Sequence, residues 1–160
     1  MAKLTRFMKI TFIFYIGWLF IFVVVKFSGL SIRISSIKQN IESGVYNYNL
    51  VPFRSLGYYF QNITEPFGYT NILGNMICFL PLGFLLPFVF KRAGSFVNTI
   101  VVCFITILGI EIFQLITMVG YFDMDDIILN TLGCLIGRSV FGIFQYFFGE
   151  RGQKKFLASR

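Results

Sequence analysis

The sequence has no histidine, and Asp, Glu, Lys and Arg together make up only 13% of its 160 residues. A chain with so few charges is too apolar for an ordinary soluble domain. Without histidine, any metal ion would be held by carboxylate, amide and water oxygens, which favours Mg²⁺, Ca²⁺ or Mn²⁺. No recognised nucleophile motif is present, and we expect neither a metal site nor a cofactor.

Cysteine is also scarce. The three cysteines, Cys78, Cys103 and Cys134, lie in different apolar runs and form no CxxC pair. This spacing is typical of packed thiols and favours neither a disulfide nor a zinc site. We therefore expect all three to be free thiols packed between helices.

Hydrophobic residues, by contrast, make up 56% of the chain, and the mean hydropathy is +0.75. A bilayer core of about 30 Å is crossed by roughly 20 helical residues, so this length allows about four or five crossings. No room remains for a separate soluble catalytic domain. The composition predicts an all-α integral membrane protein, a helical bundle of about four transmembrane helices.

Four apolar runs are long enough to be these helices. They cover residues 10–25, 72–90, 96–119 and 127–148. The first run could instead belong to a cleaved signal peptide, because the small residues Ser28 and Gly29 follow it, but no A-x-A-like cleavage site is present. We favour an uncleaved anchor helix. The predicted organisation is an anchor helix at 1–26, an extracytoplasmic or interfacial loop at 27–70, a core of three transmembrane helices at 71–148 and a basic cytoplasmic tail at 149–160.

The predicted loop at 27–70 is rich in aromatic residues. It carries Tyr46, Tyr48, Phe53, Tyr58, Tyr59, Phe60, Phe67 and Tyr69. Rings at this density are typical of a segment in the headgroup zone of a membrane. Because structureless loops of this length are uncommon in compact domains, we expect interfacial or re-entrant helical pieces within it.

The net charge of +7 comes from basic residues that lie mainly between and beyond the apolar runs. Three precede the first run, two follow the second and four lie in the C-terminal tail, whereas the turn around Tyr121 has none. The positive-inside rule therefore predicts that both termini are cytoplasmic. Nucleic-acid binding is not expected, because these residues flank membrane helices and do not form one basic face.

With this orientation, the polar residues of the membrane helices gather near the extracytoplasmic face. They form three pairs, each of which shares a helix face through i,i+3 or i,i+4 spacing. The pairs are Asn71 with Asn75, Glu111 with Gln114, and Asp126 with Asn130. The last stripe continues through Gly133 and Gly137, a small-xxx-small pattern that lets helices approach closely.

Glu111 is the most informative of these residues, because a carboxylate inside a bilayer costs about 2.5–3.5 kcal/mol and usually faces the bundle interior. We hypothesise an intramembrane ion pair with Arg138, which lies near the middle of the last helix. A simpler role stays open. Any of the polar pairs could serve only to hold the bundle together through hydrogen bonds between helices.

Two further features indicate structural roles. Asp123, followed by Asp126 three residues later, is typical of a helix N-cap with a favourable carboxylate at the third helical position. Pro81 frees the Ile77 carbonyl and is expected to bend the second apolar helix. The positions expected to be structural are Pro52, Pro81, Gly83, Gly133, Gly137 and Arg138.

Four blocks of residues occur in an order and spacing that resemble the VanZ-like family of small bacterial membrane proteins. The blocks are residues 49–53 (NLVPF), 74–83 (GNMICFLPLG), 111–114 (EIFQ) and 123–133 (DMDDIILNTLG). The resemblance covers residues 49–137, most of the chain. It implies a multi-pass protein of the bacterial cytoplasmic membrane.

The family takes its name from a protein that lowers susceptibility to the glycopeptide antibiotic teicoplanin, so the resemblance implies a similar role at the outer membrane face. The positions it marks for ligand contact are Asn75, Glu111, Gln114, Asp123, Asp126 and Asn130. Many members place an arginine between the Gln block and the aspartates, where this chain reads Gly120-Tyr121-Phe122. A ligand contact made by that arginine would be altered or absent here.

Three functions are compatible with these residues. The first, which we favour, is a non-catalytic factor among the membrane lipids that binds a lipid-linked cell-wall precursor or the lipoglycopeptide itself, or alters its presentation at the surface. The second is an enzyme acting on a lipid-linked substrate, with Glu111 as general base and Asp123 or Asp126 as acid or cation ligand. The third is an ion-coupled carrier, which would require a homo-oligomer because four helices are few and no internal repeat is evident.

Overall fold

The protein is a bundle of four long helices with smaller elements covering one end. The computed structural model describes residues 2–25, 30–90 and 95–148. The long helices are α1 (Ala2–Val25), α4 (Pro66–Val89), α5 (Phe96–Thr117) and α6 (Met124–Phe148). Each is long and apolar enough to cross a membrane, which confirms the predicted multi-pass, all-α class with four spans. The predictions concerning Lys26, Ser28, Gly29, the basic turn at 91–92 and the tail at 149–160 lie outside the described residues.

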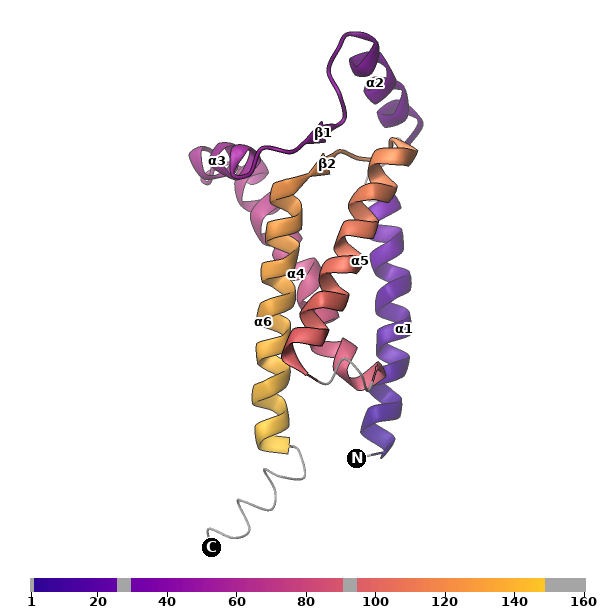
Figure 1. The fold of residues 1–160 in the computed structure, drawn as a ribbon, viewed down its shortest axis with the longest axis vertical. Helices are drawn as coiled ribbons and strands as arrows, with labels where there is room; N and C mark the ends of the chain where they lie inside the picture. The colour runs from indigo at the N-terminus through magenta and orange to yellow at the C-terminus, as the bar shows by residue number, and fades with distance from the viewer. Residues whose placement is uncertain (1, 26–29, 91–94, 149–160) are drawn as a thin grey trace, which may run out of the picture.

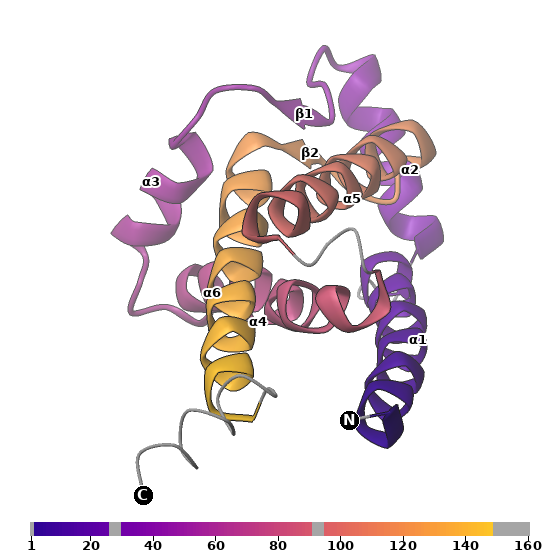
Figure 2. The same cartoon turned by 60° about the horizontal axis from the view of Figure 1, so that its bottom comes forward.

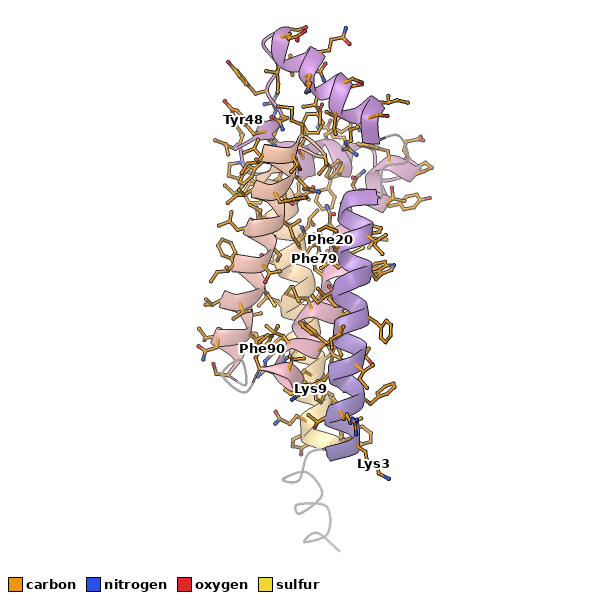
Figure 3. All side chains as sticks on the ribbon, turned by 90° about the vertical axis from the view of Figure 1, so that its right-hand side faces the viewer. Lys3, Lys9, Phe20, Tyr48, Phe79 and Phe90 are labelled. Carbon is orange, nitrogen blue, oxygen red and sulfur yellow. The ribbon has the colours of Figure 1, made fainter. Side chains whose placement is uncertain are left out.

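The helices alternate in direction. α1 and α5 run toward one end of the bundle, and α4 and α6 run back from it, so the N-terminus and the last turn of α6 share the opposite end (Figure 1). We call the first of these ends the capped end, because it carries α2 (Leu30–Glu42), β1 (Tyr48–Asn49), α3 (Arg54–Gln61) and β2 (Phe122–Asp123). In Figure 3, Lys3 and Lys9 lie at the opposite end from Tyr48.

Helical pieces do occur within 27–70, as predicted. α2 and α3 lie on opposite sides of the capped end, with α3 beside the first turns of α4 and α6 (Figures 1 and 2). On α2 the Ile37 side chain is buried, and on α3 the Leu56 side chain packs with Ile72 and Leu129 of the bundle. Each helix therefore docks through an apolar side chain and leaves its other faces exposed.

The closest packing in the bundle joins α4 to α6. A side chain added at Gly133 would collide with the Met76 carbonyl, and one added at Gly137 with the Leu80 carbonyl. From the other helix, Gly83 meets the backbone of Cys134 in the same way. The three glycines let the backbones of α4 and α6 touch, which confirms the predicted small-xxx-small contact.

The bundle core is apolar and includes all three thiols. Cys78, Cys103 and Cys134 are free and buried. The hydroxyl of Tyr15 in α1 donates a hydrogen bond to the Cys78 carbonyl at 2.9 Å and joins α1 to α4. Pro81 lies inside α4, which continues as helix on both of its sides, and the predicted bend there stays a prediction. The outer helix faces expose large apolar side chains such as Phe14 and Ile116, as lipid contact requires.

A short parallel strand pair at the capped end was not predicted. Tyr48 of β1 lies opposite Phe122 of β2, and Asn49 lies opposite Asp123. The Phe122 N–H donates to the Asn47 carbonyl at 3.0 Å. Each strand has only two residues, too few for any period-two pattern to be visible in the sequence. This pairing nevertheless brings the block at 49–53 against the block at 123–133.

Candidate functional site

The carboxylate of Asp125 fastens α3 to the bundle. It is fully buried, with 0% of the residue exposed, and accepts three backbone N–H groups. These belong to Phe53 at 2.6 Å, Ser55 at 2.8 Å and Leu56 at 3.0 Å. The first N–H groups of a helix have no partner within the helix, and α3 has no side-chain cap of its own. Asp125 therefore serves as the cap of a helix some seventy residues away in sequence.

Phe53, the residue that precedes α3, has an unusual backbone conformation. Its φ of 66° lies in the left-handed region, which favours glycine. The residue is nevertheless 67% exposed, so packing of its side chain does not account for the strain. The N–H of Phe53 is held by Asp125, which supplies part of the structure that maintains the conformation.

Asp123 caps α6 and ties the capped end together. Its Oδ1 accepts the Asp125 N–H at 2.9 Å, which confirms the predicted N-cap. The Asn49 amide also donates to Oδ1, at 3.2 Å, and the Ser55 hydroxyl donates to Oδ2. Because Asn49 and Ser55 flank the turn at Pro52, Asp123 anchors this turn on both sides.

Asp126 points to a different neighbour. The Asn75 amide donates to its Oδ1 at 2.6 Å, joining the blocks at 74–83 and 123–133. On the α3 side, the partly buried Tyr59 lies near the same carboxylate. Burial raises the pKa of Tyr59 above its ordinary value, and the charge of Asp126 raises it further.

Glu111 belongs to this end of the bundle and not to an ion pair with Arg138. It is 3% exposed, accepts the Asp123 N–H at 3.2 Å and lies close enough to Asp126 to interact with it electrostatically. The Arg138 Nε donates to the Thr99 hydroxyl at 3.2 Å, and Thr99 precedes Glu111 by about 18 Å of α5. The predicted pair is therefore wrong.

The surroundings of Arg138 explain how the bundle accepts this cation. Its guanidinium lies over the rings of Phe96, at 5.4 Å, and Phe141, at 5.0 Å. Aromatic faces attract a cation within about 6 Å. The sequence of one helix does not determine its register against another, and the antiparallel packing of α5 on α6 places Arg138 level with the start of α5.

The remaining polar residues predicted for the site differ in the hydrogen bonds that they make. The Gln114 side chain lies against Gly120 and makes no hydrogen bond within the described ranges. Asn130 is 3% exposed, and its Oδ1 has no hydrogen-bond partner among the described residues, nor does the Thr131 hydroxyl next to it. Asn71 donates to the Phe67 carbonyl of its own helix. Asn75, Glu111, Asp123 and Asp126 are thus brought together, while Gln114 and Asn71 lie outside their contacts.

Comparison with known proteins identifies the family of this chain. The VanZ/LLP1 family model matches residues 12–145, which include all four blocks. The chain belongs to the VanZ/LLP1 family. It is 32% identical to Protein VanZ of Enterococcus faecium over an alignment of 112 residues, which covers 67% of this chain and 62% of that protein. The chain thus matches less than two thirds of that relative's length. No solved structure matches the chain.

Four residues of this VanZ/LLP1 chain that were not predicted from the sequence join the elements around the site. Asn49, Ser55 and Asp125 hold the capped end together, and the buried Asn47 donates to the Leu115 carbonyl at 3.1 Å. Asn49 and Asp125 lie inside two of the recognised blocks, so block membership was the available signal. Asn47 and Ser55 had no such signal in the sequence, because their hydrogen-bond partners are distant in the chain.

The turn at Gly120-Tyr121-Phe122 is contacted from α2. The Asn40 amide donates to the Tyr121 hydroxyl at 3.2 Å. Arg33, also on α2, lies close enough to interact with Tyr121, and burial lowers the pKa of Arg33. A cation of α2 is therefore present beside this turn.

The carboxylates of the site do not form a cluster of metal-ligating side chains within the described residues. In the described part of the chain, no three His, Cys, Asp or Glu side chains lie close enough to hold an ion together. Most of the acidic oxygens accept hydrogen bonds from backbone or amide N–H groups instead. The arrangement can organise polar groups at a membrane surface and can hold a buried carboxylate, Glu111, beside a second one.

Proposed function

We propose that this VanZ/LLP1-family protein lowers susceptibility to glycopeptide antibiotics such as teicoplanin by acting at the outer face of the bacterial cytoplasmic membrane. Both termini are then cytoplasmic, and the capped end faces outward. The basic side chains of Lys3, Arg6 and Lys9, at the start of α1, support this orientation through the positive-inside rule. The family relationship supports the activity, since the matched relative is Protein VanZ.

One observation carries the proposal. Motif residues from all four blocks meet at the capped end, where Asn49, Asn75 and Glu111 each contact an aspartate of the block at 123–133. Nothing in simple helix packing requires four separate segments to place their polar residues at one end. A common polar site accounts for this arrangement.

Exposed aromatic side chains lie next to that site. They are Phe53, Tyr58, Phe60, Phe67 and Tyr69, with Tyr58 and Tyr59 both packed edge-on against Phe67. Such rings favour the boundary between headgroups and acyl chains. An amphiphile could place its acyl part along these rings and its polar part against Asn75 and Asp126. A lipid-linked cell-wall precursor and a lipoglycopeptide both have this shape.

The test is antibiotic susceptibility of a Gram-positive host that expresses the protein at matched membrane levels. Wild type is expected to raise the inhibitory concentration of teicoplanin, and Glu111→Gln and Asp126→Asn are expected to lose the effect. Ser139→Ala is the matched control, because its exposed hydroxyl bonds only to the Leu135 carbonyl of its own helix. Absence of any protection by correctly inserted wild type would refute the resistance function.

A second function, an enzyme acting on a lipid-linked substrate, is favoured by one feature. Glu111 is buried beside Asp126, and pairs of carboxyl groups in different surroundings are typical of acid-base catalysis. The two functions separate in membranes supplied with lipid-linked precursor. An enzyme would release a product that wild type forms and Glu111→Gln does not, whereas a binding factor would leave the precursor unchanged.

A further inference from the structure

Three basic side chains form a stripe along the first turns of α1, at the end of the bundle opposite the capped end. They are Lys3, Arg6 and Lys9, spaced three residues apart, and all three are exposed. Steps of three residues keep them within about 120° of the helix circumference. Met8 and Tyr15 pack in the bundle core from roughly the opposite side of α1. The basic stripe therefore faces away from the other helices.

A ring contact between α1 and α4 fixes the depth of the basic stripe. Phe12 of α1 packs edge-on against Phe90, the residue that ends α4, with ring centroids 6.3 Å apart. Lys9 lies about 4.5 Å beyond Phe12 toward the start of α1, and Lys3 lies about 14 Å beyond it. In Figure 3 both lysines lie beyond Phe90. The basic stripe therefore begins where α4 ends.

The last turn of α6 indicates that this level is the edge of the membrane. The rings of Phe88 in α4 and Phe144 in α6 lie 5.9 Å apart, close to the level of Phe90. Beyond Phe144, α6 ends in three exposed rings, those of Tyr146, Phe147 and Phe148. Exposed aromatic rings at helix ends are typical of the headgroup boundary. The headgroup layer is about 5–7 Å thick, so Lys9 lies within it and the long Arg6 side chain can reach back to it.

The described charges are separated between the two ends of the molecule. The acidic residues within the described ranges lie at the capped end or in the half of α5 that leads to it, and they are Glu42, Glu65, Glu111, Asp123, Asp125 and Asp126. None of these carboxylates lies beside the basic stripe. Three cations within about 9 Å of one helix attract negative charge together. By charge complementarity, the partner of the stripe is anionic.

The same face of α1 becomes apolar directly after the basic stripe. Ile10, Ile13 and Phe14 are exposed and continue the angular range of the stripe toward the middle of the bundle. A phospholipid has the same order of parts, a charged headgroup followed by apolar chains. A soluble anion would contact only the cations. The face as a whole therefore fits a lipid better than free phosphate.

We propose that Lys3, Arg6 and Lys9 bind the phosphate-bearing headgroups of anionic phospholipids in the leaflet at this end of the bundle. The acyl chains lie along the apolar continuation of the same face. Basic residues beside a membrane helix are typical of such binding, because each one near the surface adds to the attraction of anionic lipid. This inference goes beyond the proposed function and does not depend on it, because these lipids are bound whatever the capped end acts on.

Native mass spectrometry of the purified full chain in a neutral detergent tests the proposal. The protein is titrated with phosphatidylglycerol and, separately, with phosphatidylcholine that has the same acyl chains. Wild type is expected to bind the first phosphatidylglycerol at least about tenfold more tightly. Lys3→Gln, Arg6→Gln and Lys9→Gln combined should weaken the binding of phosphatidylglycerol at least about tenfold, because each cation contributes about fivefold. Binding of phosphatidylcholine should not change.

Matched variants separate the basic stripe from the overall charge of the protein. Lys38→Gln with Arg54→Gln removes two exposed cations from the capped end and should change the affinity for phosphatidylglycerol less than about twofold. Lys3→Arg with Lys9→Arg keeps both charges and should keep the binding. Lys9→Gln alone, with an expected loss of about fivefold, tests the stripe should the combined variant insert incorrectly.

Three results would overturn the proposal. The two lipids could bind with equal affinity, the combined variant and Lys9→Gln could both keep the wild-type affinity for phosphatidylglycerol, or the variant of Lys38 and Arg54 could lose as much affinity as the combined one. Glycerol 3-phosphate carries the charge without acyl chains and is expected not to displace the lipid, and displacement would identify a site for soluble phosphates instead. Antibiotic susceptibility does not enter this experiment, so either proposal can fail alone.

Discussion

The carboxylate of Asp125 accepts the backbone N–H of Ser55 at 2.8 Å, although the two residues are seventy positions apart in the chain. This contact, with those to Phe53 and Leu56, makes the start of α3 dependent on the start of α6. A surface helix of eight residues is too short to be stable alone. The start of α3 is therefore held in place by a cap that α6 supplies.

Replacing Asp125 by asparagine should release α3. The amide has one acceptor oxygen in place of two, so at least one buried N–H loses its partner, at a cost of about 2–3 kcal/mol in the free energy of unfolding. Hydrogen exchange of residues 53–61 should accelerate while that of α5 stays slow. Glu65→Gln, at an exposed carboxylate beside the same helix, is the control. Unchanged exchange in Asp125→Asn would show that the carboxylate does not hold α3.

The contact between α4 and α6 should not tolerate a side chain at Gly137. Because a Cβ there meets the Leu80 carbonyl, Gly137→Val is expected to lower the free energy of unfolding by at least about 2 kcal/mol. Gly109 on α5 has no atom within 4 Å of its added Cβ, so Gly109→Ala should change stability by less than about 1 kcal/mol. Unfolding by denaturing detergent compares the two, and equal effects would contradict the close contact.

Arg138 and Glu111 should act independently. In a double-mutant cycle, Arg138→Leu and Glu111→Gln are expected to add within about 0.5 kcal/mol, because the two side chains are far apart. Arg138→Leu and Thr99→Val share a hydrogen bond and should instead show a coupling energy of about 0.5–1.5 kcal/mol. Strong coupling between Glu111 and Arg138 would restore the ion pair that the structure excludes.

Tyr59 should lose its proton only at unusually high pH. Its pKa is raised above the ordinary 10.0, first by burial and then by Asp126. The folded state thus holds the proton more tightly than the unfolded state, so this group stabilises the fold below about pH 10 and the stability is lost as pH rises further. The tyrosinate absorbance of wild type minus that of Tyr59→Phe reports the transition. Asp126→Asn should lower the pKa, and no change would contradict their proximity.

Phe53 should matter more for activity than for stability. Glycine adopts the left-handed conformation without strain, so Phe53→Gly is expected to keep the free energy of unfolding within about 1 kcal/mol of wild type. If the exposed ring contacts the ligand, the same variant should reduce protection against teicoplanin. Equal protection by both proteins at matched levels would remove Phe53 from the proposed binding surface.

Much of the fold could be predicted from the sequence, because a membrane helix is recognised from one continuous apolar run. The apolar runs at 72–90 and 96–119 needed only length and hydropathy to be recognised. The glycines at 133 and 137 indicated a close helix contact through their spacing, and Asp123 indicated a cap through its position before an apolar run. The glycine and cap signals depend on neighbours within about seven residues, and the apolar runs on about 20 consecutive residues.

Only the tertiary structure decided what the acidic residues do. Asp123, Asp125 and Asp126 are nearly adjacent in the chain, yet they face the turn at Asn49, the start of α3 and the Asn75 amide respectively. Which carboxylate meets which partner depends on the rotation of α6 and on how a segment seventy residues away folds over it. Arg138 shows the same limit, because its level against α5 is set by the register between two helices. Local sequence determines where helices lie, but contacts between distant segments follow from packing, in which every helix constrains the others.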